Sequence, residues 1–165
     1  MNALAPRSID ERSESGGRGP VTLRRAVPDD CEQVWSWNFA PDVRARSRRA
    51  LAVAFVEHQR WFMRRLADGH DPMWVVEEHG RPVGVIRLDT SASGLTQVSI
   101  ALAAQARGRG VGRRAITTAC QAWGKPIIAE IFADNLPSRA CFEACGFRSV
   151  VEAEGLLTYY WDPET

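Results

Sequence analysis

A turn with three alternate glycines, at residues 108 to 112, constrains the fold of this sequence more than any other stretch. Residues 97–102 precede it and alternate polar and apolar side chains at their start, as a half-buried strand does. Residues 116–123 follow it and repeat apolar side chains at helical spacing. Glycines let the backbone turn tightly, and the free amides at the start of a helix favour phosphate. The stretch therefore predicts a strand, a phosphate-binding turn and a helix in succession.

Two common phosphate motifs do not match this turn. A Walker A loop needs a lysine after its second glycine, whereas Lys125 is the only lysine in the chain. A dinucleotide-binding turn spaces its glycines differently and comes early in its domain. The pattern Arg107-x-x-Gly110-x-Gly112 instead resembles motif A of the GNAT superfamily of N-acetyltransferases, whose backbone amides hold the pyrophosphate of acetyl-CoA. The alternative interpretation is a glycine-rich loop that arginines cap without any ligand.

A second stretch, residues 130–147, strengthens this resemblance. It is similar to the second GNAT signature, in which a strand ends at Asn-x-x-Ser, here Asn135 and Ser138, and a helix closes on Gly-Phe. The two signatures and the expected order β-α-α-β-β-β-α-β-α-β-β extend the resemblance over about residues 20 to 162. The resemblance implies an α/β fold with a central mixed, mostly antiparallel sheet flanked by helices. It also implies that two strands splay apart at the acetyl-CoA site.

Composition favours one soluble domain. The chain has 165 residues, of which 45% are hydrophobic and 25% charged, and residues 20–165 are enough to bury a core. Residues 1–19 are polar and rich in Gly and Ser, so they predict a mobile tail. The net charge of +1 creates no field that would attract nucleic acid or membrane. We therefore expect a single GNAT domain after a short tail.

Cysteine, histidine and apolar patterns suggest neither a metal centre nor a membrane span. Four cysteines and three histidines show no zinc-ligand spacing. No apolar run approaches the roughly 20 residues that span a bilayer, and the start of the chain has no apolar signal core. We expect a cytoplasmic protein with reduced thiols and no metal. The oligomeric state stays open, with a homodimer among the options.

Local patterns predict the elements. A helix is expected after Pro28 with Asp29 as its cap, and Asn135 is the expected cap of the helix that ends near Gly146. A further helix is expected over residues 55–66, and the strands are expected at residues 21–25, 73–78, 83–89, 97–102, 126–132, 147–151 and 156–161.

The resemblance also implies which residues hold acetyl-CoA as co-substrate. The turn would bind the pyrophosphate, the strand edge near residues 100–103 would pair with the pantetheine amides, and the start of the following helix would complete the site. The residues implied are Ile100, Leu102, Arg107, Gly108, Arg109, Gly110, Val111, Gly112, Arg113, Asn135, Ser138 and Phe142.

The family transfers acetyl directly to an amine, without a covalent acyl-enzyme. An amine must lose its proton before it attacks, so a general base is expected. Glu130 stands five residues before Asn135, where the N-acetyltransferases of ribosomal-protein alanine termini similarly carry a glutamate that serves as base. The alternative is a carboxylate that merely lies on the sheet surface. Help for the oxyanion would come from a backbone N–H near residues 100–102.

The proton donor to the departing thiolate is less clear from the sequence. Many family members place a tyrosine seven residues after the Asn, and this chain has Phe142 there, which has no proton to give. Because a thiol has a pKa of about 8.5, the thiolate can also leave unaided. Cys141 and Cys145 are expected to be small core residues rather than nucleophiles. The remaining donors are Ser138, which we take as the catalytic candidate, Cys141, Tyr159 and water.

The first half of the chain is similar to the GNAT branch that acetylates the 4-amino group of a nucleotide-linked aminosugar in pseudaminic-acid-type biosynthesis. The stretches that carry this similarity are Trp37-Asn38 with Pro41 and Val43-Arg44, then Glu57-His58 and Trp61-Phe62, then residues 83–89. The resemblance implies a sugar pocket formed by Trp37, Asn38, His58 and Trp61. Core or surface positions are the alternative for each of these side chains, and a surface position is the commoner one for a helical histidine. The basic run Arg44, Arg46, Arg48 and Arg49 would meet the diphosphate, since arginine offers a planar fork to phosphate oxygens.

Other acceptors stay open. A protein N-terminal acetyltransferase would share Glu130 but would present an open groove for a peptide. An enzyme for aminoglycosides or polyamines would favour an acidic pocket, and the first half offers few acids beyond Asp42 and Glu57. A module that binds acyl-CoA without turnover is suggested by Phe142 and opposed by Glu130. The primary expectation is a small-molecule amine as acceptor.

Overall fold

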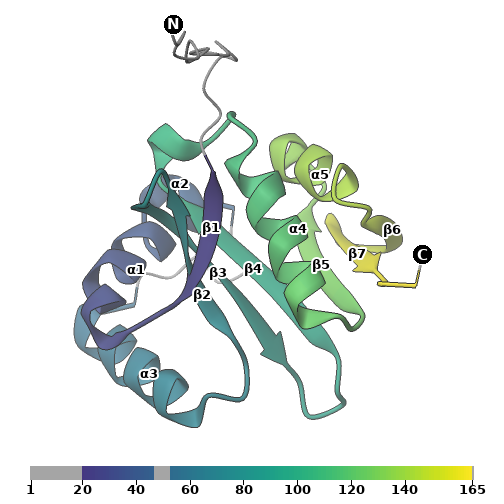
Figure 1. Cartoon of the computed structure of the whole chain (residues 1–165). Coiled ribbons are helices and arrows are strands. Elements are labelled where there is room, and N and C mark those ends of the chain that lie inside the picture. The colour runs from purple at the N-terminus through teal and green to yellow at the C-terminus, as the bar shows by residue number, and fades with distance from the viewer. Residues whose placement is uncertain (1–19, 47–52, 165) are drawn as a thin grey trace, which may run out of the picture.

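A seven-stranded sheet forms the centre of the molecule (Figure 1). The computed structural model describes residues 20–46 and 53–164. The strands lie in the order β1-β2-β3-β4-β5-β7-β6, and all neighbours are antiparallel except β4 and β5, which are parallel. This confirms the predicted α/β fold with a mixed, mostly antiparallel sheet. The expected tail at residues 1–19 lies outside the described residues, as do Arg48 and Arg49 of the basic run.

The first third of the described chain contributes one strand and three helices. They are β1 (Val21–Arg25), α1 (Cys31–Asn38), α2 (Pro41–Arg44) and α3 (Phe55–Asp68). The expected order contained two helices here, and the short α2 is the addition. It begins at Pro41, whose fixed φ suits the first position of a helix. Helix α3 ends at Gly69 in the left-handed conformation, with φ of 65°.

The predicted cap at Asp29 is wrong, because its neighbour Asp30 is the acid that the fold uses. A 3₁₀ turn occupies Pro28–Asp30, and the Asp30 carboxylate accepts a hydrogen bond from the Val27 amide at 2.8 Å. Both of its oxygens also lie 2.7 Å from the Arg24 guanidinium. This bidentate pair holds the pKa of Asp30 below its usual range and ties the start of α1 to β1.

The next two strands form the expected hairpin, with a tighter turn than predicted. They are β2 (Met73–Glu78) and β3 (Arg81–Thr90). His79 and Gly80 form the turn with φ of 52° and 71°, as a two-residue hairpin loop requires. Pro82 therefore lies inside β3, opposite Glu77, where the register shifts between Val76 and Glu77. An irregularity of this kind accommodates a residue that has no amide to donate.

The remaining elements are β4 (Thr96–Leu102), α4 (Val111–Trp123), β5 (Ile127–Phe132), α5 (Leu136–Glu143), β6 (Arg148–Ala153) and β7 (Leu156–Trp161). The strands match their expected ranges within about two residues at each end. Helix α4 begins five residues before the apolar repeat at residues 116–123, and α5 ends three residues before Gly146. Asn135 caps α5 as predicted, since its side chain accepts a hydrogen bond from the Ser138 amide at 3.4 Å.

Helices cover both faces of the sheet, and Figure 1 shows α4 and α5 together on one side of it and α1 beside α3. The larger core joins α4, through Ile116 among others, to Ile86, Val98 and Ala129 of the sheet. The second core packs α1 and α3 against the other face and contains Phe62, which is fully buried. Burying such a ring contributes about 2 kcal/mol. Successive side chains of a strand point to opposite faces of the sheet. A strand residue that belongs to one of these cores therefore shows to which face its neighbours point.

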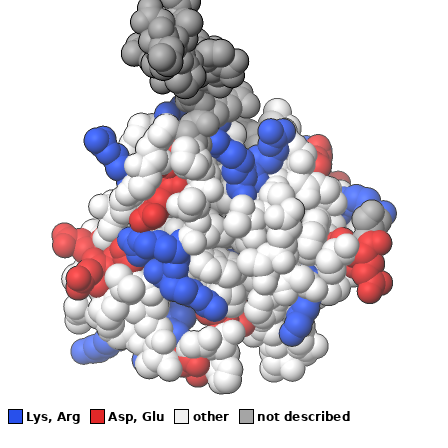
Figure 2. Space-filling model, viewed as in Figure 1, with Lys and Arg blue, Asp and Glu red and all other residues white. Residues whose placement is uncertain are grey.

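Charges of both signs are interspersed on the surface that Figure 2 shows, around a centre that is largely uncharged. This agrees with the net charge of +1. None of the helices in the described residues is long and apolar enough to cross a membrane.

Candidate active site

The parallel strands β4 and β5 diverge and leave a V-shaped opening in the sheet. Within the described part of the chain they pair at a single position, Gln97 with Ile128, near the start of each strand. Beyond this pair the strands continue to Leu102 and Phe132 without pairing. The glycine-rich turn follows β4 and the cap of α5 follows β5, so both lie at the wide end of the V.

The open edge of β4 presents the backbone groups that the sequence assigned to the cofactor. Ala103 donates its amide to Val83 of β3 at 2.9 Å. In an antiparallel ladder, alternate residues turn their amides and carbonyls to opposite sides. The backbone groups of Leu102 and Ile100 therefore point away from β3, toward β5. These are the positions from which pantetheine amides would find hydrogen-bond partners.

The turn itself has the backbone conformation that its glycines predict. Gly108 and Gly110 have φ of 71° and 78°, where other residues are strained. An added Cβ at either position would meet nothing within 4 Å, so the space beside the turn is open. Gly110 is the N-cap of α4, and Val111 is its first residue. The amides at the start of this 13-residue helix have no partners within the helix and form a site for an anion.

Two carboxylates hold the arginines of the turn. Arg107 donates to the Leu102 carbonyl at 3.0 and 2.8 Å and pairs with Asp42 of α2. Arg109 lies 2.5 Å from Glu78, and Arg114 lies 3.8 Å from the same carboxylate. Glu78 is only 7% exposed and ends β2, so it anchors the turn to the neighbouring strand.

Arg113 differs from these arginines, since it is exposed in the first turn of α4. Its side chain makes no hydrogen bond with the other described residues, while its carbonyl accepts one from the Cys145 thiol at 3.5 Å. The sequence did not predict the role of Glu78, because a glutamate at a strand end carries no motif.

Asn135 and Ser138 lie where β5 meets α5. The Asn135 side-chain oxygen accepts from the Ser138 amide and, at 3.1 Å, from Arg46. Asn135 is 9% exposed, and Ser138 is partly buried. A cavity of about 290 Å³ adjoins this pair, and it is lined by Ala45, Arg46, Phe132, Asp134 and Asn135. The bond to Arg46 brings the basic run, 89 residues away in sequence, to the wide end of the V.

Phe142 lies in the core rather than on a cofactor surface. It is 5% exposed and packs edge-on against Phe147, with ring centroids 5.0 Å apart. Its role toward acetyl-CoA remains a prediction, and the structure gives its ring little surface for a ligand to contact. Sequence spacing identified the position of the family's tyrosine but not the direction of this side chain.

Glu130 lies just past the apex of the V. Its oxygen Oε2 accepts a hydrogen bond from Gln97 Nε2 at 3.3 Å, which bridges β5 and β4. Ala129 and Ile131 on either side of it belong to the core under α4, so Glu130 points to the opposite face. Glu130 is partly buried there, and this position argues against the alternative interpretation that it is a plain surface carboxylate.

Glu130 belongs to a polar strip that crosses three strands on this face. Arg87 pairs with Ser99, and Asp89 pairs with Gln97, in the register of β3 and β4. The Arg87 and Asp89 side chains form an ion pair at 2.9 Å. We call this set the polar strip, and its members are Arg87, Asp89, Gln97, Ser99 and Glu130.

Tyr159 does not share a face with Glu130. In the pairing of β5 with β7, Tyr159 lies opposite Ala129, and Glu130 lies opposite Thr158. Directly paired residues project to the same side of a sheet. The Tyr159 hydroxyl instead donates to Glu143 at 2.8 Å, and burial together with that carboxylate raises its pKa. Tyr159 is therefore a poor candidate for the proton donor.

The predicted sugar-pocket residues divide into buried and accessible ones. Trp37 is 7% exposed and His58 is 3% exposed, so both belong to the core between α1 and α3. His58 contacts the Cys31 carbonyl through Nε2 at 3.1 Å, and burial lowers its pKa. The alternative of a surface position for His58 is excluded, because α3 turns His58 inward among the rings of Phe39, Phe55, Trp61 and Phe62. Its direct contact with an acceptor stays an untested prediction.

Asn38 and Trp61 are partly exposed. Trp61 is flanked by two guanidinium groups, those of Arg87 and Arg65, at 5.2 and 5.8 Å from its ring centroid. It is thus the predicted pocket residue that comes closest to the polar strip. Asn38 ends α1, next to Phe39.

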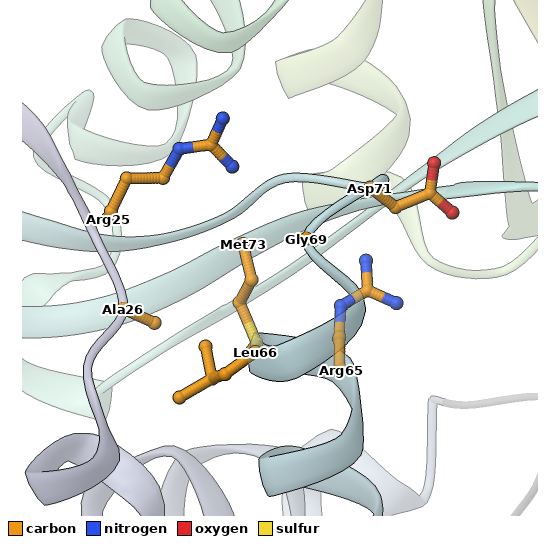
Figure 3. A pocket seen from close by; sticks show the side chains of 7 residues that line it. All are labelled: Arg25, Ala26, Arg65, Leu66, Gly69, Asp71 and Met73. Atoms are coloured by element: carbon orange, nitrogen blue, oxygen red, sulfur yellow. The ribbon is translucent and has the colours of Figure 1, made fainter.

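A second cavity, of about 250 Å³, lies away from the V (Figure 3). Its lining comes from the end of β1, the last turns of α3 and the start of β2, and comprises Arg25, Ala26, Arg65, Leu66, Gly69, Asp71 and Met73. It contains none of the predicted site residues. Within the described residues, no group of three or more His, Cys, Asp or Glu side chains is arranged to bind a metal ion.

The acetyltransferase (GNAT) family model matches residues 31–147, which include the open V, the turn and the α5 cap. The chain belongs to the GNAT acetyltransferase family. A comparison with curated protein sequences gave no match.

Solved structures of acetyltransferases share this fold at low sequence identity. A spermidine N-acetyltransferase from Vibrio cholerae, in complex with CoA and spermine, superposes with a TM-score of 0.75 at 16% identity, over 87% of this chain and 96% of that one. An N-acetyltransferase from Staphylococcus aureus Mu50 gives 0.69 at 20% identity, over 88% and 99%. A ribosomal-protein-alanine N-acetyltransferase from Brucella melitensis gives 0.68 at 23% identity, over 86% and 99%. The names of the Vibrio cholerae and Brucella melitensis proteins specify different acceptors, so the shared fold leaves the acceptor of this enzyme open.

Proposed function

We propose that this GNAT enzyme acetylates the 4-amino group of a nucleotide-linked aminosugar, with acetyl-CoA as donor and Glu130 as general base. The observation that carries the proposal is the Glu130 carboxylate, held by Gln97 at the apex of the V on the face that α4 leaves open. A base in this position lies beside the unpaired edge of β4, on the face of the sheet against which α1 and α3 pack.

The residues of the turn fit acetyl-CoA. The positive φ of Gly108 and Gly110, the open space beside them and the first amides of α4 suit a pyrophosphate. The exposed Arg113 adds positive charge at the same helix end. The backbone groups of Ile100 and Leu102 face the gap in which the pantetheine arm would lie. When bound there, acetyl-CoA supplies an acetyl group as a thioester that an amine can attack.

The chain's own contribution to the reaction is proton transfer and positioning. Glu130 would take a proton from the acceptor ammonium, directly or through a water, so that the nitrogen lone pair is free to attack the thioester carbonyl. The amine nitrogen would add to the thioester carbonyl, which forms the C–N bond and an oxyanion, and collapse of that oxyanion would break the C–S bond and release the thiolate of CoA. A backbone N–H on the open edge of β4 would stabilise the oxyanion.

Ser138 is the side-chain proton donor that remains after Tyr159 is set aside. It lies in the first turn of α5 at the wide end of the V. Cys141 was also a candidate donor from the sequence. Its pKa is raised because its thiol donates a hydrogen bond to Cys145 and is partly buried. With Ser138 or water as donor, the absence of the family's tyrosine at Phe142 does not prevent turnover.

The basic run supports a phosphorylated acceptor. Arg44 stacks over the Phe39 ring at 4.9 Å, and Arg46 donates to Asn135. Arg44 thus ends α2, and Arg46 reaches the wide end of the V, where arginine forks would bind the diphosphate of a nucleotide sugar. The acids of this region are few, and Asp42 is engaged by Arg107, which lowers the pKa of Asp42. This makes a polycationic acceptor a poor fit.

The proposal is tested by measuring release of CoA thiol from acetyl-CoA with three acceptor sets: nucleotide-linked 4-aminosugars, polyamines, and peptides with free N-termini. Turnover confined to the aminosugars supports the proposal. Turnover on peptides alone assigns the enzyme to N-terminal acetylation, and binding of acetyl-CoA without turnover on any acceptor indicates a binding module. Either of the last two results overturns the aminosugar assignment.

A further inference from the structure

Three arginines, Arg44, Arg65 and Arg87, concentrate positive charge beside the polar strip, on the face of the sheet to which Glu130 points. We call this group of arginines the corner. Arg65 and Arg87 lie over the Trp61 ring, Arg44 lies over the Phe39 ring, and the His58 ring between them contacts both. Arg65 and Arg87 share one carboxylate, Asp89, which accepts from Arg65 at 2.6 Å and from Arg87 at 2.9 Å. A single carboxylate cannot balance the two guanidinium groups of Arg65 and Arg87.

The two arginines that share Asp89 differ in how many of their guanidinium hydrogen-bond donors remain available for a ligand. Arg65 uses one terminal nitrogen on Asp89 and the other on the Leu88 carbonyl, and its side chain is 12% exposed. Arg87 uses Nε on Asp89, and its side chain is 29% exposed. Its terminal nitrogens find no acceptor within the described part of the chain. Asp89 thus fixes the plane of the Arg87 guanidinium and leaves its fork for a ligand.

Arg44 and Arg87 act on one another. Burial lowers the pKa of Arg44, and the nearby charge of Arg87 lowers it further. An anion bound near both guanidinium groups would lower the repulsion between them. His58 adds no charge at neutral pH, since burial lowers its pKa.

The distance between Arg87 in the corner and the candidate base Glu130 fits an acceptor that carries both a phosphate and an amine. Arg87 is on β3 and Glu130 on β5, with β4 between them. Two strand spacings amount to about 10 Å, and the splay of β4 from β5 adds to this. Both side chains project to the same face of the sheet, where Gln97 bonds to Glu130 and pairs with Asp89.

We propose that Arg87, together with Arg44, forms a phosphate subsite that selects an acceptor whose amine lies on the order of 10 Å from a phosphate group. This inference rests on the proposed function and names the feature of the acceptor that the enzyme recognises. Arg87 is a specificity-determining residue in this arrangement, and Asp89 positions it.

The first test is independent of the acceptor. Inorganic pyrophosphate is titrated by calorimetry into full-length protein saturated with CoA, so that the cofactor occupies the glycine-rich turn. Wild type should bind it, and Arg87→Gln should weaken binding about tenfold to a hundredfold, as expected for loss of charge-assisted hydrogen bonds. Arg87→Lys should recover part of the affinity. The matched control is Arg81→Gln, which removes an exposed arginine at the start of the same strand, outside the corner.

The second test uses turnover. With a phosphate-bearing amine, Arg87→Gln should raise the acceptor KM by a similar factor while kcat and the KM for acetyl-CoA change little. With the matched amine that lacks the phosphate, the variant should equal wild type. A purely structural role would change both acceptors alike.

The outcomes separate the two proposals. If nucleotide-linked aminosugars are not acetylated but pyrophosphate binding depends on Arg87, the subsite stands and the proposed acceptor is wrong. If aminosugars are acetylated while Arg87→Gln binds pyrophosphate as wild type does, the subsite is refuted. Absence of pyrophosphate binding to the wild-type protein refutes it as well.

Discussion

Gln97 Nε2 donates a hydrogen bond to Glu130 Oε2 across the gap between β4 and β5, at 3.3 Å. Gln97 belongs to the single position at which the described residues of these strands pair, and Glu130 lies two residues past that position on β5. A side-chain contact therefore continues where the backbone ladder stops. It keeps the Glu130 carboxylate at the apex of the opening. A base in a fixed position needs no reorganisation before it accepts a proton.

Replacing Glu130 by Gln should lower kcat about a hundredfold or more at neutral pH, because general-base catalysis typically contributes that much. The affinity for acetyl-CoA should stay the same, since the turn and α4 are untouched. Steady-state kinetics and calorimetry measure the two effects. The control is Glu152→Gln, a change of the same kind on the exposed strand β6. Equal rates in wild type and Glu130→Gln would make Glu130 a structural residue.

Replacing Gly110 by Trp should abolish measurable binding of acetyl-CoA, because the indole would fill the space beside the first amides of α4 and because φ of 78° strains any side chain. Gly94→Trp is the matched control. Gly94 has φ of 82° and open space around it, but it lies in the turn before β4. Calorimetric titration with acetyl-CoA decides the matter. Retained affinity in Gly110→Trp would show that this turn is not the cofactor site.

The buried His58 should make the fold sensitive to mild acid. Burial lowers the pKa of His58, while the unfolded chain protonates its histidine near pH 6.5. Below that pH the unfolded state binds more protons than the folded state, so the free energy of unfolding falls as the pH falls. For one group the slope reaches at most about 1.4 kcal/mol per pH unit.

Urea denaturation of wild type, His58→Gln and His70→Gln at pH 7.5 and 5.5 tests this dependence. His70 is an exposed histidine, so its variant should lose stability with acid as wild type does. His58→Gln should lose less than either. If all three proteins respond equally, another group is responsible.

Cys145 should react with iodoacetamide at neutral pH faster than the other thiols. The Cys141 thiol donates a hydrogen bond to it, and with further help from Thr117 and Arg113 this lowers the pKa of Cys145 to about 7. Cys120 is the internal control, because burial raises its pKa to about 12. Mass spectrometry gives the alkylation rate of each cysteine between pH 6 and 9. Cys141→Ala should slow alkylation of Cys145 at pH 7, and an unchanged rate would contradict the assigned cause.

The elements were predictable where local chemistry is decisive. The left-handed glycines of the turn, the Asn135 cap and the alternation along β4 each act within a few residues, so the sequence reports them directly. The cap before α1 was assigned to the wrong acid, because Asp29 and Asp30 are equivalent locally and the choice depends on Arg24 of β1. The direction of His58 was missed for a similar reason. Its helix is amphipathic, but only packing against α1 determines which face turns inward.

By itself the sequence determined the fold, the conformation of the glycine-rich turn and the position of the candidate base, because motif spacing and backbone conformation are local properties. Only the tertiary structure decided what surrounds them. It showed that Glu78 anchors the turn, that Tyr159 and Glu130 project from opposite faces, and that Arg87 and Asp89 lie on the same strip as Glu130. These relations depend on strand order and register, which bring together residues that lie tens of positions apart in the chain. A carboxylate or guanidinium acquires its role from those neighbours.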